Sequence, residues 1–155
     1  MATAETKSHK NIEQLNSFLR GEISAVETYR LALDKVSYDS PVRAQLEANR
    51  NSHERRVQAL EHKIRSLGGL PAKGSGPWGA LVKAVETVSK ALGRKATISA
   101  LEQGEDHGLK DYRTDLKKLD PDGQLLVTSE LLPQQEETHR AMRELQGDMR
   151  KGSPA

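Results

Sequence analysis

Two segments of the chain share a Gly-Glu dipeptide followed by a tyrosine seven residues after the glutamate. In one segment Glu22 precedes Tyr29, and in the other Glu105 precedes Tyr112. Seven residues make about two turns of an α-helix, so each glutamate shares a helix face with its tyrosine. Because the same face holds the apolar residues of the segment, both carboxylates are expected to point into a protein core.

Two histidines take comparable positions in two other segments. His53 belongs to a series with alternating spacings of four and three residues, which also includes Arg50, and His139 belongs to another such series. Glu136 and His139 form Glu-x-x-His, a spacing that places both side chains on one helix face. The first series is Leu46, Arg50, His53, Val57, Leu60, Ile64 and Leu67, and the second is Leu132, Glu136, His139, Met142 and Leu145.

Buried carboxylates are costly unless they are paired or bound to a cation. The residues expected to meet in the core are three carboxylates and two imidazoles, namely Glu22, His53, Glu105, Glu136 and His139. These ligand types suit iron, manganese or zinc, so a pair of divalent metal ions is one solution. The other is a network of buried ion pairs in which Arg50 supplies the positive charge and no metal is bound.

Other residues could contribute to the metal site or to the network of ion pairs. Glu102 lies one turn before Glu105 on nearly the same face, which makes it a candidate additional ligand. Tyr29 and Tyr112 are placed to hydrogen-bond the ligands, although buried tyrosines are more often core residues with a satisfied hydroxyl. The adjacent Arg55 and Arg56 are assigned to an outer, solvated face.

The elements that hold these residues are all predicted to be helical, because apolar residues recur at helical spacing and no segment alternates for long with period two. Ser40 and Pro41 predict the start of a helix, and Gly68-Gly69 predict its end. Pro133 lies inside the last helix and predicts a kink or a bulge there. The expected helices cover residues 11–38, 41–67, 79–92, 96–119 and 124–147, followed by a frayed tail at 148–155.

Four of these helices are long, and the short helix 79–92 lies in the connection between the second and third long ones. This order predicts one all-α domain over residues 1–155, an up-down four-helix bundle with a long crossover. Residues 68–77, GGLPAKGSGP, form the loop of that crossover. Trp78 is expected to anchor the loop onto the bundle.

Composition excludes several classes of protein. The chain has 24 Lys and Arg against 22 Asp and Glu, and the net charge of +2 is too small for an electrostatically driven nucleic-acid binder. The absence of cysteine excludes disulfides and thiolate metal sites. There is neither an apolar run of membrane-spanning length nor the apolar stretch of a signal peptide, so a cytoplasmic location is expected.

The polar pattern resembles the ferritin-like superfamily, and within it the rubrerythrin-type domains. That superfamily has one Glu on each of two helices and Glu-x-x-His on each of the other two. Glu22 and Glu105 match the two lone glutamates, while Glu136 and His139 match one complete pair. His53 matches the histidine of the second pair, so the resemblance implies five of the six ligands of a di-iron carboxylate site.

One position departs from the superfamily pattern. Arg50 stands where the second pair should have its glutamate, and a protonated guanidinium cannot bind a metal ion. It could instead form a bidentate bridge to one of the carboxylates.

More narrowly, the chain is similar to a bacterial ferritin-like family of unknown function. The similarity lies in the Gly-Glu-Asp sequence at residues 104–106 and in the Gly- and Pro-rich crossover. It implies a metal-handling protein, with ferroxidase or peroxide-reducing chemistry if iron binds. The alternative is a non-enzymatic, stress-associated bundle or interaction scaffold whose carboxylates are satisfied by Arg50. A homodimer is the default expectation for the assembly.

Overall fold

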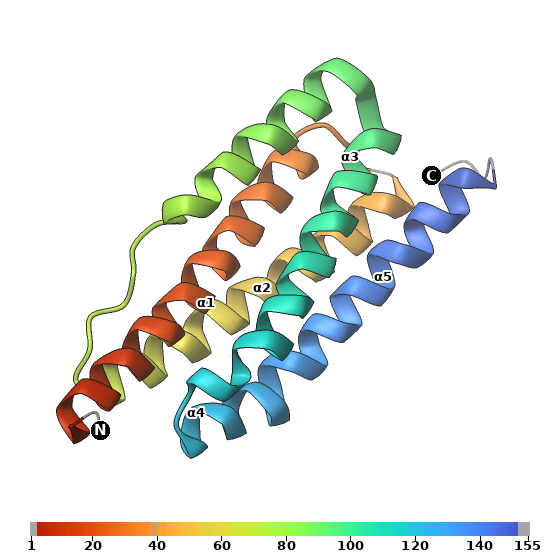
Figure 1. Cartoon of the computed structure of the whole chain (residues 1–155). Coiled ribbons are helices and arrows are strands. Elements are labelled where there is room, and N and C mark those ends of the chain that lie inside the picture. The colour runs from red at the N-terminus through yellow and green to blue at the C-terminus, as the bar shows by residue number, and fades with distance from the viewer. Residues whose placement is uncertain (1–2, 39, 152–155) are drawn as a thin grey trace.

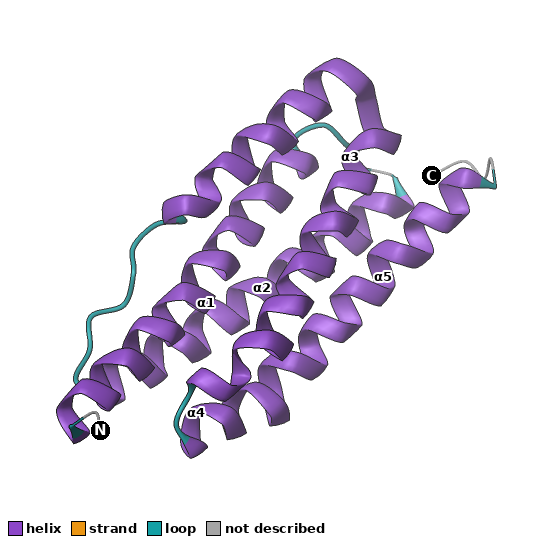
Figure 2. Cartoon of the chain, in the orientation of Figure 1, coloured by secondary structure: helices purple, strands orange, loops and turns teal. Residues whose placement is uncertain are grey.

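The computed structural model describes residues 3–38 and 40–151, and these residues form helices and loops without any strand (Figures 1 and 2). This confirms the predicted all-α fold. None of the described helices is both long and apolar enough to cross a membrane. The elements, in chain order, are α1 (Ala4–Leu33), α2 (Pro41–Ser66), the 3-10 turn η1 (Gly76–Trp78), α3 (Gly79–Asp115), the 3-10 turn η2 (Leu116–Lys118), α4 (Pro121–Leu126), the π-helical turn η3 (Val127–Leu131) and α5 (Leu132–Arg150).

The bundle consists of α1, α2, the second part of α3, and α5. The helices α1 and α2 are antiparallel, and so are α3 and α5 (Figure 1). The loop after α2 and the first part of α3 run along the outside of α1, back toward the end of the bundle where α2 began (Figure 1). The second part of α3 therefore runs in the same direction as α2, as the long crossover predicts.

The ends of α2 follow from the residues predicted to set them. The Ser40 hydroxyl accepts a hydrogen bond from the Val42 amide at 3.2 Å, and Pro41 is the first helical residue. At the other end Gly68 has a φ of +80°, a left-handed conformation that favours glycine. The observed helix ends at Ser66, one residue before the predicted end.

The observed α1 is shifted toward the N-terminus relative to the predicted 11–38. It begins at Ala4 because the Thr3 hydroxyl accepts a hydrogen bond from the Thr6 amide. It ends at Leu33, where Arg43 Nη1 donates at 2.9 Å to the carbonyl oxygens of both Leu33 and Val36. The guanidinium thus satisfies carbonyl groups that a longer helix would have paired.

The division predicted between helices 79–92 and 96–119 is confirmed, because α3 consists of two helices that meet at a kink. The kink is at Gly93, whose φ of 82° and ψ of −165° are not helical. Its first part covers α1 from outside, and its second part enters the bundle (Figure 1). The helix ends at Asp115, before the predicted end, because a 3-10 turn follows.

The bulge predicted near Pro133 is confirmed. The residues Val127–Leu131 form a π-helical turn directly before α5, and Pro133 lies in the first turn of α5. A proline nitrogen cannot donate to the preceding turn, and the wider turn accommodates the missing bond. The predicted helix 124–147 is therefore three elements, and its last one extends to Arg150.

Two apolar clusters fill the bundle and leave a polar zone between them. One cluster includes Leu15, Leu60 and Leu131, and the other includes Leu33, Leu46 and Met142. All six of these residues are buried. The helices are therefore held together by apolar packing on both sides of the level at which Glu22 and Glu105 lie.

We expect the Gly93→Ala variant to be less stable than the wild type by about 1–3 kcal/mol, because its backbone conformation is essentially restricted to glycine. Gly147 is a matched control, since it lies in regular helix and a Cβ atom there meets nothing within 4 Å. Gly147→Ala should gain about 0.5–1 kcal/mol. Thermal unfolding followed by circular dichroism measures both. Equal effects of the two substitutions would contradict the assignment of the kink.

Candidate functional site

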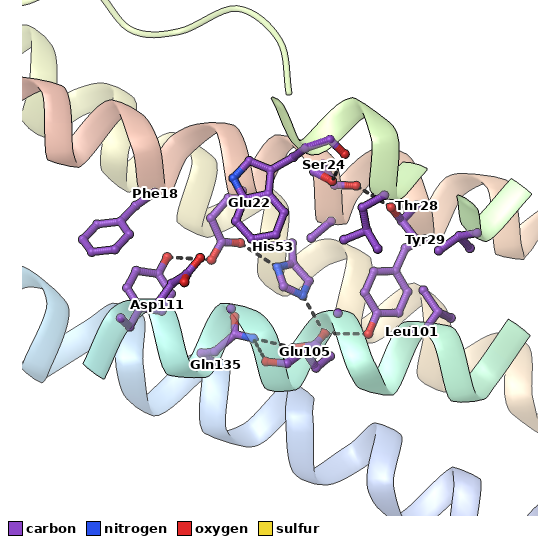
Figure 3. Close-up of a pocket in the computed structure, with 18 of the residues that line it drawn as sticks. Phe18, Glu22, Ser24, Thr28, Tyr29, His53, Leu101, Glu105, Asp111 and Gln135 are labelled. Atoms are coloured by element: carbon purple, nitrogen blue, oxygen red, sulfur yellow. Dashed lines mark hydrogen bonds and ion pairs between the residues drawn. The ribbon is translucent and has the colours of Figure 1, made fainter. Parts of the chain in front are cut away.

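A buried polar cluster lies at the middle of the bundle, and all four helices contribute to it (Figure 3). The six residues are each at most 4% exposed. They form two i, i+3 pairs, on α2 and α5, and two single glutamates, on α1 and α3. The members of this central polar cluster are Glu22, His53, Arg56, Glu105, Gln135 and Thr138.

His53 lies between the two glutamates. Its Nδ1 is 2.6 Å from Glu22 Oε2, and its Nε2 is 2.7 Å from Glu105 Oε1. An ionised carboxylate only accepts hydrogen bonds, so both ring nitrogens donate and the ring carries a proton on each. The three side chains therefore form a line, carboxylate to imidazolium to carboxylate, rather than converging on one point.

Arg56 supplies a second positive charge and is fully buried. Its Nη1 donates to Glu22 Oε1 at 3.2 Å and also to Gln135 Oε1. Its Nη2 donates to Thr138 Oγ1 at 3.1 Å. One guanidinium thus joins α2 to α1 and α5 inside the core, through the planar set of donors that only arginine has.

The α5 pair holds the remaining glutamate. Gln135 Nε2 donates at 2.8 Å to both the carbonyl oxygen and Oε2 of Glu105. The Thr138 hydroxyl donates to the same Oε2 at 2.8 Å. Each of these side chains also accepts a bond from Arg56, so α3 and α5 are linked through the cluster.

Two tyrosines supply the remaining hydrogen-bond donors to the carboxylates of Glu22 and Glu105. The Tyr112 hydroxyl donates to Glu22 Oε1, and the Tyr29 hydroxyl donates to Glu105 Oε1, each at 2.6 Å. Asn49 Nδ2 in turn donates to the Tyr29 hydroxyl at 3.0 Å. Each tyrosine of the repeat thus binds the glutamate of the other segment, and all four carboxylate oxygens have donors.

These contacts set the charge states. Burial raises the pKa of Glu105, but His53, Arg56 and Tyr29 outweigh it and bring that pKa to about 2. Burial also raises the pKa of Glu22, while Arg56 and His53 lower it below its ordinary value. Burial and Arg56 lower the pKa of His53, but Glu105 and Glu22 raise it above 6.5 overall. The cluster therefore holds two negative and two positive charges and is neutral.

The structure brings together three of the five candidate ligands, Glu22, His53 and Glu105. The expectation that Glu136 faces the core is wrong, since its side chain is 49% exposed and pairs with Arg113 at 3.4 Å. His139 is largely buried, but its Nε2 contacts Glu102 at 3.0 Å, outside the central polar cluster. No group of three His, Asp or Glu side chains among the described residues is arranged to hold a metal ion.

The buried cation is Arg56 and not Arg50. Arg50 is 30% exposed, and its Nε lies 3.9 Å from Glu54. Arg56, assigned above to an outer face, is fully buried. The spacing allowed both solutions, because Leu46 and Leu60 are inward in either one. A series through Asn49, His53 and Arg56 has spacings of four and three residues, and one through Arg50, His53 and Val57 has spacings of three and four, so both fit one helix face.

The same ambiguity in helical spacing explains why Gln135 and Thr138 were not predicted to face the core. Leu131 and Leu132 are adjacent, and the predicted series started from Leu132, which is only partly buried. Starting from the fully buried Leu131 gives Gln135, Thr138 and Met142 as the inward residues. The repeat of the two glutamates was the signal that could have indicated these residues. Two buried carboxylates require hydrogen-bond donors on the facing helices, and the carboxylate of Glu136 cannot donate.

Comparison with known proteins places the chain in a family. The family model described as "Domain of unknown function (DUF2383)" matches residues 10–118. The chain therefore belongs to the DUF2383 family. No curated protein matches it.

A solved structure from Bacillus anthracis str. Ames, described as "ferritin like, diiron-carboxylate proteins", is similar to this DUF2383 chain. The two are 21% identical, with a TM-score of 0.64 over 97% of this chain and 98% of that chain. At this identity the likeness shows the fold alone, and this DUF2383 chain has the ferritin-like fold.

The donor set of the central polar cluster does not fit a pair of metal ions. The superfamily pattern supplies four carboxylates and two imidazoles, with Glu-x-x-His at each i, i+3 pair. Here the α2 pair is His53 and Arg56, and the α5 pair is Gln135 and Thr138. Two carboxylates that are already neutralised by two internal cations cannot balance the charge of two divalent ions.

The free energy of unfolding should be greatest between about pH 4.5 and pH 6.5. Above 6.5, the ordinary pKa of His53, the folded protein keeps a proton that the unfolded chain releases, so stability falls as pH rises. Below pH 4.5 the glutamate is protonated in the unfolded chain, whereas Glu105 in the folded protein, with a pKa of about 2, stays ionised. Stability therefore falls as the pH drops.

Urea unfolding at a series of pH values measures this profile. His53→Gln should lose the decline on the alkaline side, while His62→Gln, at an exposed position of the same helix, should keep it. A wild-type profile that stays level on the alkaline side would contradict a protonated His53.

Replacing Arg56 by Met should cost about 3–5 kcal/mol of stability, because it leaves the buried Glu22 carboxylate without its cation. Arg50→Met is the matched control and should cost less than about 1 kcal/mol, as is usual for a surface ion pair. Adding Glu22→Gln to Arg56→Met should restore part of the loss. Urea unfolding measures all three variants, and a loss for Arg50→Met as large as for Arg56→Met would refute the assignment.

Proposed function

We propose that this protein is a metal-independent ferritin-like bundle that serves as a non-enzymatic interaction scaffold. The observation that supports this most is the fully buried Arg56 guanidinium inside the central polar cluster. Since the buried i, i+3 pair of α2 is His53 and Arg56 rather than Arg50 and His53, this positive charge takes the position of the pair's histidine in the superfamily pattern. Together with His53 it neutralises Glu22 and Glu105, so the fold is complete without a metal.

Every polar atom that points into the cluster is also engaged by another protein atom. The carboxylates accept from Arg56, His53, Gln135 and Thr138, as well as from the two tyrosines. A catalytic centre needs at least one group that is free to meet a substrate or an oxidant. The central cluster offers none, which favours a structural role for it.

Metal handling is the second candidate, and two observations favour it. The similar Bacillus anthracis structure is described as a diiron-carboxylate protein. Glu22, His53 and Glu105 also supply ligand types that suit iron, manganese or zinc. For a metal ion to bind, His53 would have to release one of its two ring protons and Arg56 would have to leave Glu22. Ferroxidase or peroxide-reducing chemistry would follow only after both changes.

Anaerobic reconstitution with ferrous iron separates the two candidates. The wild-type protein, purified without a His-tag, should retain only substoichiometric iron after removal of unbound metal. Elemental mass spectrometry measures the metal content, with manganese and zinc tested in parallel. About one or two irons per chain, with the fold intact by circular dichroism, would overturn the proposal.

A variant designed to bind iron also tests the proposal that the wild-type residues do not fit a metal site. The substitutions His53→Glu, Arg56→His, Gln135→Glu and Thr138→His rebuild Glu-x-x-His at both i, i+3 pairs. This quadruple variant should bind about two irons per chain, because Glu22 and Glu105 already supply the lone glutamates. Adding Glu22→Gln and Glu105→Gln should abolish that binding. A folded quadruple variant that takes up no more iron than the wild type would refute the correspondence between these positions and the superfamily ligands.

The physiological setting stays a prediction. A cytoplasmic location, a bacterial stress role and a homodimer are predictions from the sequence pattern and the resemblance.

A further inference from the structure

A cavity of about 60 Å³ lies beside the central polar cluster. The helix α1 forms one wall, the second part of α3 forms another, and the crossover covers them with Trp78, Leu81 and Val85. Phe18 and Asp111 lie toward one end of the cavity, and Tyr29 and Leu101 toward the other (Figure 3). By volume, such a space holds roughly two water molecules or the body of a small organic molecule.

Most of the chain's aromatic side chains line this one cavity. The whole sequence has five aromatic residues, namely one Trp, three Tyr and one Phe. Four of them line the cavity: Phe18, Tyr29, Trp78 and Tyr112. The faces of aromatic rings attract organic cations, and this attraction is stronger where water is excluded.

The glycines of the Gly-Glu repeat bring the crossover close to the cavity. A Cβ atom on Gly21 would lie 3.6 Å from Cε2 of Trp78, and one on Gly104 would lie 3.8 Å from Cδ2 of Leu81. The Ser24 hydroxyl also donates to the Trp78 carbonyl oxygen at 3.4 Å. These contacts agree with the anchoring role predicted for Trp78, and they hold its ring over the cavity.

Three carboxylates line the cavity, and they differ in their partners. Glu22 and Glu105 are fully engaged in the central polar cluster. Asp111 is 35% exposed, and its nearest ion-pair contact is His107 Nε2 at 3.8 Å, beyond hydrogen-bond distance. Burial raises the pKa of Asp111, while His107 lowers it only in part. Asp111 is therefore the lining carboxylate that gains most from an added cation.

We propose that this cavity is a binding site for a small organic amine in its protonated form. The apolar body of the amine lies among Phe18, Trp78 and Tyr112, and its ammonium group lies at Asp111. A metal ion does not suit the site, because Asp111 is the one lining carboxylate outside the central polar cluster and offers too few oxygen ligands. The proposal goes beyond the scaffold function and does not depend on the metal content of the central polar cluster.

The test compares isobutylamine with isobutanol, its neutral isostere of equal heavy-atom count. Trp78 is the single tryptophan, so its indole N–H signal in a proton–nitrogen NMR spectrum of the full chain reports the cavity. At neutral pH the amine should shift this signal with a dissociation constant in the millimolar range, as expected for five heavy atoms. It should bind about fivefold more tightly than isobutanol, because only the amine carries a charge.

Variants place the binding at the proposed atoms. Asp111→Asn should lower the affinity for isobutylamine to that for isobutanol. Asp115→Asn is the matched control, because Asp115 lies on the same helix, pairs with Lys118 at 2.9 Å and does not line the cavity. It should leave both affinities unchanged. Ala25→Leu, which fills the cavity, should weaken both ligands at least severalfold, with the fold checked by circular dichroism.

Three outcomes would overturn the proposal. Equal affinity for amine and alcohol would mean that the cavity takes neutral molecules. Unchanged amine affinity in Asp111→Asn would place the amine elsewhere on the surface. No shift of the Trp78 signal with either ligand would mean that the cavity is closed to both. None of these results bears on iron content, so the scaffold proposal is tested separately.

Discussion

Two ionised carboxylates inside a helical bundle are the constraint on which the rest of this structure depends. Glu22 and Glu105 are almost fully buried, and an unpaired charge at such a depth would cost several kcal/mol. The protein meets that cost with donors from all four helices. His53 bridges the two carboxylates, Arg56 binds one of them, and the α5 pair binds the other. The cluster therefore joins the four helices at one level, between two apolar regions that provide most of the packing.

The same constraint explains what could be predicted from the sequence. The repeat of Glu and Tyr predicted that Glu22 and Glu105 share the core, because both residues lie on apolar helix faces. The partners of these glutamates were not predictable from periodicity, since Arg56 and Val57 are equally compatible with the spacing of the leucines around them. A preference for the apolar residue placed Val57 inward and Arg56 outward. Only the need to neutralise charge on other helices reverses that choice, and it becomes visible when the helices are assembled.

The fold and the chemistry of its centre are separable in this protein. The bundle has the ferritin-like fold, yet the buried i, i+3 pairs of α2 and α5 are His with Arg and Gln with Thr. Unlike Glu-x-x-His, these pairs contain no carboxylate, and one of them carries a guanidinium. The fold alone is therefore weak evidence for metal chemistry, and the donor set is the stronger evidence.

The central polar cluster and the cavity share a wall, because Glu22 belongs to both and Tyr112, which donates to Glu22, also lines the cavity. The bond from Tyr112 to Glu22 fixes the orientation of an aromatic face that lines the cavity. Arg56 and His53 neutralise Glu22, which leaves that wall without net charge toward a ligand. Selectivity for charge in the cavity must then come from a residue outside the cluster, and Asp111 is the lining carboxylate that meets this condition. The ion pairs of Arg56 and His53 with the two glutamates thus leave Asp111 as the lining carboxylate that is not already neutralised inside the cluster.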